Sequence, residues 1–324
     1  MCRYSSRTNV TRYTDATRTH RLDPDSFAGG YFRNAVYRHW DPYEDISQSL
    51  LEQDRERLIA RDQTEAEFDG LRRTLALFGA GEEAVTQDLA PMAYVLDDVD
   101  EQMFLTTQLY EEAKHTAFFD RYWREVVDPV AEACGFEVTA PTDERYFDEE
   151  YVELFDRTEA AMERLLTDER PEALARAFCH YHLVVESVLA QTGYYGIQSA
   201  WSPSGPDVAV EGEPVHLEGL IEGITRVRSD EGRHVGFGMR AVQRLIAEEG
   251  VDPDVVQETL QDLLPLVTGT VQNPDSDVDS ADLVAYASEK LARRVEIITD
   301  SEAELPPVEE LVHVEGGRDV SADD

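Results

Sequence analysis

Apolar residues recur at helical spacing along most of the chain, and no stretch alternates convincingly between apolar and polar positions as a half-buried strand does. The spacing predicts a helix that ends near residue 61 and further helices at about 63–95, 100–127, 149–167, 171–196, 217–250, 254–271 and 280–298. Proline, glycine and acidic residues mark 128–150 and 201–215 as irregular. The chain is therefore predicted to be all-α, with at least four long helices able to surround a buried site.

The two ends of the chain lack this helical pattern. Residues 1–30 are rich in Thr, Arg and Ser, and residues 301–324 are acidic and contain Pro and Gly. Polar chain ends without apolar periodicity have little to pack against a core. We expect a flexible leader at 1–30, one helical domain at 31–300 and a flexible acidic tail at 301–324.

The formal net charge is −39, from 68 acidic and 29 basic residues, and Lys114 and Lys290 are the only lysines. The acidic residues are spread along the whole chain, which predicts a solvated acidic surface that repels nucleic acid. Such a surface resembles those of proteins from salt-accumulating halophiles, in which ions screen the repulsion. The composition therefore predicts a halophilic archaeal source.

Cysteine usage and hydropathy exclude several other classes. The cysteines at 2, 134 and 179 are scattered without Cys-x-x-Cys spacing, which argues against a disulfide framework and against a thiolate metal site. No apolar run approaches the roughly 18 residues that span a bilayer, and the N-terminus has no apolar signal core. We therefore expect a cytoplasmic protein without stable membrane insertion.

Glutamate and histidine recur at the spacing i, i+3, which puts both side chains on one helix face. Four such Glu-x-x-His motifs are present: Glu112/His115, Glu213/His216, Glu231/His234 and Glu310/His313. The second contains a proline and the fourth lies in the acidic tail, so neither fits a helix. The first and third each lie inside a predicted helix and remain as candidate metal-binding motifs.

Two such motifs plus a Glu from each of two other helices form the ligand set of four-helix di-metal carboxylate proteins. On the helix at 63–95 this Glu is Glu82 or Glu83. On the helix at 171–196 it is Glu186, which interrupts the apolar run 183–189, where a carboxylate is costly unless it is paired or binds metal. Four carboxylates and two imidazoles suit two cations such as iron or manganese. Asp230 could accept the second N–H of a metal-bound imidazole.

Each of these assignments also has an interpretation without metal. The two motifs could be exposed pairs on an acidic surface, Glu186 could lie at the edge of an apolar face, and Asp230 could be an ordinary surface acid. His180 and His182 lack Glu partners at metal-binding spacing, so we interpret them as ordinary polar residues.

At these residues the chain resembles the ribonucleotide reductase small-subunit superfamily, which has a ferritin-like fold, and within it the ligand-binding oxidases that resemble that subunit. The similarity runs from about residue 40 to about residue 241 and follows the order Glu, Glu-x-x-His, Glu, Glu-x-x-His. The matching segments are Gly81-Glu-Glu-Ala-Val-Thr86, Phe104-Leu-Thr-Thr-Gln-Leu-Tyr-Glu-Glu-Ala-Lys-His115, Tyr181-x-x-x-x-Glu186, Thr192-Gly-Tyr194 and Ser229-Asp-Glu-x-x-His234. The interval between Glu186 and Glu231 is longer than the family pattern, and we assign the insertion to the loop at 201–215.

The resemblance implies a heterodinuclear Mn/Fe cofactor, with two irons as the alternative. It assigns manganese to Glu83, Glu112 and His115, iron to Glu186, Glu231 and His234, and a bridging role to Glu112. Asp230 and Tyr194 match residues that support the ligands. Val85 and Tyr181 match the pair that family members join by an ether cross-link when the reduced site activates O2. Their offsets of two residues from Glu83 and five from Glu186 do not share a regular helix face, which suggests a distorted helix.

The resemblance implies a homodimeric oxidase that uses O2 for two-electron C–H oxidation and binds a long-chain fatty acid whose carboxylate contacts the metals. Two alternatives remain open: a divergent ribonucleoside-diphosphate reductase small (beta) subunit and a ferritin-like iron-binding or storage protein. The reductase alternative is weakened because Phe119 occupies the position of the radical tyrosine, four residues after the first metal His. It is weakened further because no tyrosine follows Tyr286, whereas the classical subunit uses a C-terminal tyrosine in radical transfer.

Overall fold

The computed structural model describes residues 22–23, 25–203, 205, 215–272, 280–300 and 303–313. Most of the expected leader, the end of the expected tail and most of the 201–215 loop lie outside the described residues. Helix α1 (Phe27–Tyr37) begins inside the expected leader, and α13 (Val308–Leu311) lies inside the expected tail.

The described chain is helical and contains no strand, as the hydrophobic spacing predicts. After α1 the elements are α2 (Gln48–Ala60), α3 (Glu65–Asp88), α4 (Ala90–Val95), α5 (Val99–Tyr122), η1 (Trp123–Val127), α6 (Asp128–Cys134), η2 (Glu144–Tyr146), α7 (Glu149–Arg164), α8 (Pro171–Phe178), η3 (Cys179–Ala190), α9 (Gln191–Trp201), α10 (Glu218–Glu249), α11 (Pro253–Val271) and α12 (Ser280–Thr299), followed by α13. The element η2 is a 3-10 turn, whereas η1 and η3 are π-helical segments.

Local sequence signals explain where several helices begin and end. Thr64 caps α3 in a capping box with Glu67, in which each side chain binds the other residue's backbone N–H. Pro171 occupies the first turn of α8, where its missing N–H costs nothing. Gly250 ends α10 with φ of 74°, a left-handed conformation that favours glycine.

The helix predicted over 171–196 is continuous, but it is not a regular α-helix. It consists of α8, the π-helical segment η3 and α9, which follow one another without a break from Pro171 to Trp201. Two other predictions are corrected: the helix over 63–95 is divided at Leu89 into α3 and α4, and the stretch 128–150 contains the short helix α6. Helix α6 extends the preceding helix past Pro129, because a proline in the first turn is compatible with helical structure.

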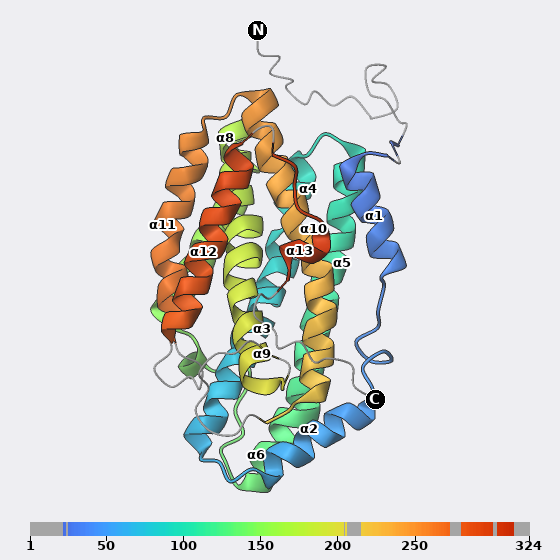
Figure 1. Ribbon diagram of the computed structural model, residues 1–324, viewed down its shortest axis with the longest axis vertical. Helices are drawn as coiled ribbons and strands as arrows, with labels where there is room; N and C mark the ends of the chain where they lie inside the picture. Colours follow the sequence, from blue (N-terminus) through green and yellow to red (C-terminus); the bar gives the residue numbers. More distant parts are fainter. Residues whose placement is uncertain are drawn as a thin grey trace.

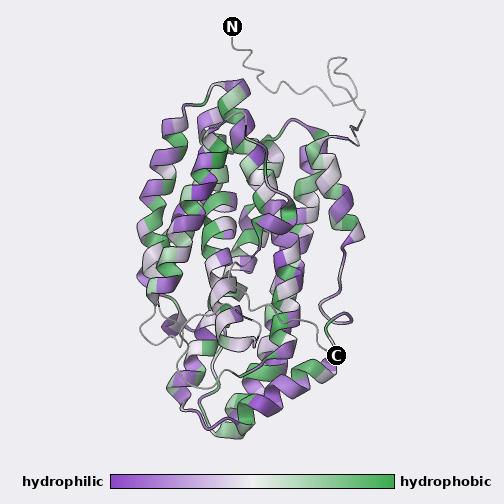
Figure 2. Ribbon diagram, viewed as in Figure 1, coloured by the Kyte–Doolittle hydropathy of each residue, from purple (hydrophilic) through white to green (hydrophobic). Residues whose placement is uncertain are grey.

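The long helices run roughly along the long axis of the molecule, while α2 crosses its lower end (Figure 1). Helix α5 packs against α3 and α10, and α10 also packs against η3. Hydrophilic and hydrophobic residues recur in stripes along these helices, as amphipathic helices around a common core require (Figure 2). The four helices that the sequence assigns to the metal site therefore lie around one interior.

No helix among the described residues has both the length and the apolar character needed to cross a bilayer.

Candidate metal centre

Two groups of buried carboxylates and imidazoles meet between α3, α5, η3 and α10. The first consists of Glu82, Glu112, His115 and Glu231, and the second of Glu112, Glu186, Glu231 and His234. In each group the candidate ligand atoms lie within 4.8 Å of one another. Because Glu112 and Glu231 belong to both groups, the geometry fits two neighbouring cations bridged by carboxylates.

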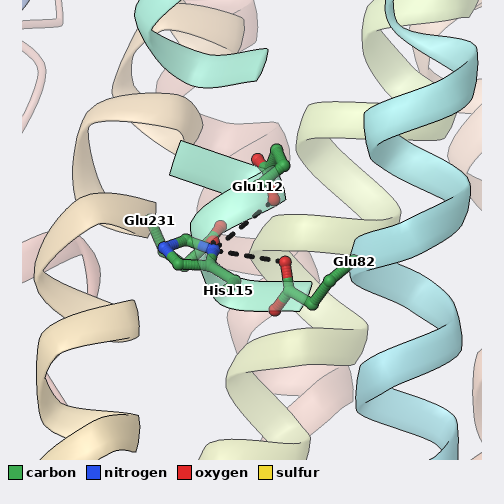
Figure 3. Close-up of side chains that lie close together, drawn as sticks. All are labelled: Glu82, Glu112, His115 and Glu231. Carbon is green, nitrogen blue, oxygen red and sulfur yellow. Dashed lines mark hydrogen bonds and ion pairs between the residues drawn. The ribbon is translucent and has the colours of Figure 1, made fainter. Parts of the chain in front are cut away.

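The first group draws its side chains from three helices, with Glu82 on α3, Glu112 and His115 on α5, and Glu231 on α10 (Figure 3). His115 Nδ1 lies 3.2 Å from Glu82 Oε2, 3.5 Å from Glu112 Oε2 and 3.3 Å from Glu231 Oε1. One imidazole nitrogen thus faces three carboxylates, and this is the arrangement of ligands around a shared centre.

The second group is built in the same way around His234. Its Nδ1 lies 3.0 Å from Glu112 Oε1, 3.7 Å from Glu186 Oε1 and 3.5 Å from Glu231 Oε2. Glu186 is 3% exposed, so the interpretation that it lies at the edge of an apolar face is wrong.

Glu82, and not Glu83, enters the metal centre. Glu82 is buried and belongs to the first group, whereas Glu83 is exposed and accepts a hydrogen bond from Gln87 Nε2 at 3.2 Å. Successive residues of an α-helix point about 100° apart, so only one of the two side chains can face the core. The assignment of Glu83 as a ligand is therefore corrected to Glu82.

The buried charges shift one another's protonation. Burial raises the pKa of Glu82 and of Glu186 well above the ordinary value, and neighbouring carboxylates add to both shifts. Burial would also raise the pKa of Glu112, but His234 and His115 outweigh it and hold that pKa well below the ordinary value. Burial would lower the pKa of His115, yet Glu82 and other acids raise it well above the ordinary value. A cluster with so many ionisable oxygens therefore favours added positive charge, either protons or metal cations.

Several ligand atoms have no hydrogen-bond partner among the described residues. They are Glu112 Oε1, Glu186 Oε2, Glu231 Oε2 and His234 Nδ1, all from residues that are at most 3% exposed. His234 Nδ1 and Glu112 Oε1 are close, but they are not aligned for a hydrogen bond. Orphaned buried polar atoms are costly, and bound cations would satisfy these, so the residues present fit a di-metal centre.

A ring of charged residues supports the two imidazoles from outside. His115 Nε2 lies 3.2 Å from Asp230 Oδ2, the position expected for a carboxylate that holds a metal-bound imidazole. Trp40 Nε1 donates to the same oxygen at 2.8 Å, and Lys114 Nζ lies 2.9 Å from it. Burial would raise the pKa of Asp230, but His115 and the nearby cations lower it far below the ordinary value. Asp230 is therefore a buried anion and not a surface acid.

Glu111 supports the second imidazole and was missed by the sequence reasoning. Its Oε2 lies 2.8 Å from His234 Nε2, and its Oε1 forms an ion pair with Arg233. Arg233 Nη2 also lies 2.6 Å from Asp230 Oδ1. Glu111 precedes Glu112 just as Asp230 precedes Glu231, and a cation precedes each His. This short repeat, acid-Glu-x-cation-His, is the signal that could have identified Glu111. Each acid crosses over to the imidazole of the other motif.

Val85 and Tyr181 both lie in the buried core beside this centre. Val85 follows Glu82 by three residues and so shares its helix face, and it lines the same cavity as Glu82, Glu112 and Glu186. The Tyr181 hydroxyl is buried and has no hydrogen-bond partner among the described residues. Burial raises its pKa well above the ordinary value, and Glu112 and Glu186 add to the shift, which indicates that the phenol lies near the cluster.

The helix that carries Tyr181 and Glu186 is distorted, as the resemblance suggested. Both residues lie in the π-helical segment η3, in which the backbone hydrogen bond spans i to i+5. Residues five apart therefore lie closer to one face than they would in an α-helix. Tyr194, in α9, is fully buried, and its ring stacks on Phe78 with a centroid separation of 5.0 Å.

A cavity connects the metal centre with the end of α3 nearest α2. Its inner end includes Glu82, Glu112, Glu186 and Glu231, and its outer end includes Arg61, Gln63, Glu67 and Arg73. Between these ends the wall is largely apolar, with Leu71, Leu77, Phe78, Val85, Val185, Leu189 and Ile197 among the lining residues. Glu67 and Glu82 both line this cavity and are 15 residues apart on α3, a rise of about 22 Å along the helix at 1.5 Å per residue.

Similar proteins of known structure share this fold and a di-metal cofactor. No protein-family profile matches the sequence. Two solved variants of an R2-like ligand-binding oxidase with an aerobically reconstituted Mn/Fe cofactor are each 27% identical, with TM-scores of 0.72 for a valine-to-leucine variant and 0.71 for a tyrosine-to-phenylalanine variant. Each match covers 85% of this chain and 94% of the other.

A third solved structure, an R2-like ligand-binding oxidase with aerobically reconstituted Mn/Fe cofactor after a long soak, is 27% identical with a TM-score of 0.70. That match covers 85% of this chain and 93% of the other. The chain thus has the ferritin-like fold of the ribonucleotide reductase small subunit, and over most of its length it is similar to the R2-like ligand-binding oxidases.

Proposed function

We propose that this protein is an O2-dependent oxidase with a Mn/Fe centre, of the R2-like ligand-binding type. The observation that carries the proposal is the pair of buried ligand groups joined by Glu112 and Glu231, in a chain similar to oxidases solved with a Mn/Fe cofactor. Manganese is assigned to Glu82, Glu112 and His115, and iron to Glu186, Glu231 and His234. When bound, the two metals supply O2 reduction and the oxidising power for two-electron C–H oxidation.

The protein's own residues hold and orient the imidazole side chains of the metal centre. Asp230 and Glu111 hold the Nε2 atoms of His115 and His234, which leaves each Nδ1 directed at the ligand groups. The buried walls around the centre exclude bulk water, which favours reaction with an organic substrate over loss of the oxidant to solvent.

The cavity suits a long-chain fatty acid. Its apolar walls match an alkyl chain, and its inner end meets the ligand groups, where a carboxylate would neutralise metal charge. The lining residues of α3 recur over about 22 Å, which suits an elongated ligand. We therefore propose that the bound ligand places its carboxylate at the metals and its chain toward Arg61 and Gln63.

We also propose that Val85 and Tyr181 become joined by an ether bond. The bond would form between a side-chain carbon of Val85 and the phenolic oxygen of Tyr181. One C–H and one O–H bond break, and two protons and two electrons leave with O2 as the final acceptor. The unpartnered Tyr181 hydroxyl and the position of Val85 in the cavity wall support this pairing.

Peptide mass spectrometry after aerobic reconstitution with manganese and iron tests the proposal. We expect a covalent link between the peptides that contain Val85 and Tyr181, with a mass two hydrogens lower than their sum. The link should be absent after anaerobic reconstitution and in Tyr181→Phe. Two bound metals without a link would favour a divergent reductase small subunit, and failure to bind metal would exclude the oxidase.

Size-exclusion chromatography of the same protein tests the remaining alternative, an iron-storage protein. We expect a homodimer, whereas assembly into a large multi-subunit cage would favour iron storage.

A further inference from the structure

A buried chain of hydrogen bonds holds Glu186. The other members of this chain, Gln108 and His182, belong to neither ligand group. Gln108 Nε2 donates to Glu186 Oε1 at 2.7 Å, and Gln108 Oε1 lies 3.2 Å from His182 Nε2. Gln108 and His182 are both fully buried, and Phe178, Tyr181 and other aromatic rings surround the imidazole. The sequence analysis interpreted His182 as an ordinary polar residue. In the structure His182 is instead connected to the metal centre through Gln108.

The direction of each hydrogen bond in this chain is fixed. With a cation bound, Glu186 is ionised and only accepts, so Gln108 turns its NH2 group toward Glu186 and its oxygen toward His182. His182 must then carry its proton on Nε2 and donate it. Burial lowers the pKa of His182 well below the ordinary value, in agreement with a neutral ring. Glu186 Oε1 is thereby engaged, while Oε2 has no partner and is available to a cation.

Glu82, the corresponding carboxylate of the other ligand group, lacks this support. Gln108 and His182 each lie four residues before a ligand, Glu112 and Glu186. At the same offset from Glu231 and Glu82 the chain has Val227 and Phe78, which offer no hydrogen bond. Among the described residues, the side-chain hydrogen bond of Glu82 is with His115, a member of its own ligand group. At the carboxylates themselves, this polar pair therefore makes Glu186 and Glu82 unequal.

We infer that Gln108 and His182 are positioning residues that restrict the Glu186 carboxylate and thereby make the two metal positions unequal. A carboxylate held through one oxygen offers the other at a fixed place, whereas Glu82 can adjust to its metal. The inference rests on the proposed di-metal function. Gln108 and His182 thus help to determine which metal binds at the Glu186 position.

Metal occupancy in variants of the full-length protein tests this inference. The protein is reconstituted with equimolar Mn(II) and Fe(II), and element-specific anomalous diffraction measures each metal at each position. Chelator competition measures how tightly the metals are held. In wild type we expect each position to be occupied predominantly by one metal. In Gln108→Leu and His182→Phe we expect the Glu186 position to bind metal about 10- to 100-fold more weakly and to lose its preference for one metal.

Matched variants separate positioning from general damage to the core. Gln191→Leu is the control, because Gln191 is also fully buried but its side-chain nitrogen and oxygen have no partner among the described residues. It should retain wild-type occupancy. His182→Gln keeps a donor near the Nε2 position and should restore most of the preference that His182→Phe loses. If Gln108→Leu does not fold, Gln108→Met retains the unbranched shape and removes the donor, so it serves the same purpose.

Wild-type occupancy and affinity in folded Gln108 and His182 variants would overturn the inference. Equal effects in Gln191→Leu would also overturn it, because they would show a packing effect. Failure of wild type itself to bind two metals would instead refute the proposed function.

Discussion

Glu82 faces the metal centre because it shares a helix face with the apolar side of α3. Leu75, Phe78 and Val85 lie seven and four residues before it and three residues after it, on the stripe that packs toward the interior. Glu83 is rotated from this stripe by about 100° and points outward. Glu82 and Glu83 thus carry the same carboxylate, but only Glu82 can contribute it to the metal centre.

Neutralising the two glutamates separately tests this difference. We expect Glu82→Gln to lower metal content toward one equivalent or to weaken binding at least 10-fold, because it removes an anionic ligand atom from the first group. Glu83→Gln should retain both metals, since Glu83 is exposed. Elemental analysis after reconstitution and desalting gives the answer, and equal metal loss in both variants would contradict the assignment.

Asp54 gives the protein a measurable pH dependence outside the metal centre. Its Oδ2 accepts from Leu220 N at 2.9 Å and from the Tyr122 hydroxyl at 3.1 Å, and the residue is fully buried. Burial raises the pKa of Asp54 from 3.8 to about 6, against the opposing effect of these donors. The folded protein thus binds a proton there more tightly than the unfolded chain does.

Between pH 4 and pH 6 the folded state holds more protons at Asp54 than the unfolded state, so this contribution to stability decreases as the pH rises. We expect the stability of wild type, relative to Asp54→Asn, to fall by about 2 kcal/mol across this interval and then to level off. Urea unfolding of both proteins at several pH values measures the difference. A difference that does not change with pH would show that Asp54 is ionised throughout.

At the residue scale, sequence reasoning identified Glu112, His115, Glu186, Glu231 and His234, and the structure brings all of them together. It left Glu82 and Glu83 open on helical spacing and chose Glu83 on the resemblance, whereas the structure brings Glu82 to the cluster. The apolar stripe of α3 carried the information needed to choose. By contrast, the contact of His182 with Gln108 joins residues 74 positions apart, so no local spacing could reveal it.

The helical elements position the centre through their register, and one glycine shows how closely they approach. Gly232 lies on α10 between Glu231 and His234, and a Cβ added there would lie 2.7 Å from the backbone oxygen of Val308. Segment 303–313 is anchored over this point, since Arg294 donates to Leu311 O and Lys290 to His313 O. Helix α13 therefore covers α10 directly behind two candidate ligands.

Gly232→Ala should displace α13, because the new methyl group would meet the backbone oxygen and the stiff, branched side chain of Val308. We expect a loss of about 1–3 kcal/mol in unfolding free energy and faster amide hydrogen exchange in residues 303–313. Gly30→Ala in α1 is the matched control, since no atom lies within 4 Å of the added Cβ. That variant should be neutral or more stable by up to about 1 kcal/mol, through helix propensity. Unchanged exchange in Gly232→Ala would show that α13 does not depend on this contact.

At the element scale, hydrophobic spacing located most long helices closely, because amphipathic stripes and caps are local properties. The π-helical register of η3 was not predictable in the same way. Its apolar run reads equally well as α-helix, and only the five-residue spacing of Tyr181 and Glu186 indicated a distortion. Intrinsic helix propensity therefore does not explain the departure from regular structure, whereas π-helical segments are frequent at functional sites.

At the scale of the whole molecule, most acidic residues that the structure describes lie outside the buried core. Formal net charge is −39, while many of its arginines are committed to ion pairs such as Arg73 with Asp148 and Arg244 with Glu101. Most of the excess acid therefore repels other acid across the surface, and this repulsion is weaker in the expanded unfolded chain. Added salt screens it, since the Debye length falls from about 10 Å at 0.1 M to about 3 Å at 1 M.

We therefore expect the melting temperature of the metal-free protein to rise by several degrees between 0.1 M and 2 M KCl. Circular dichroism at 222 nm, a helix signal, follows the transition. Sucrose at matched osmolality separates screening from general solute exclusion, because it carries no charge and should raise the melting temperature less. A melting temperature that falls with KCl would show that surface ion pairs outweigh the acidic repulsion. The metal centre gives an internal comparison: its acids are buried and far less accessible to salt, so saturating metal should stabilise the protein at both KCl concentrations.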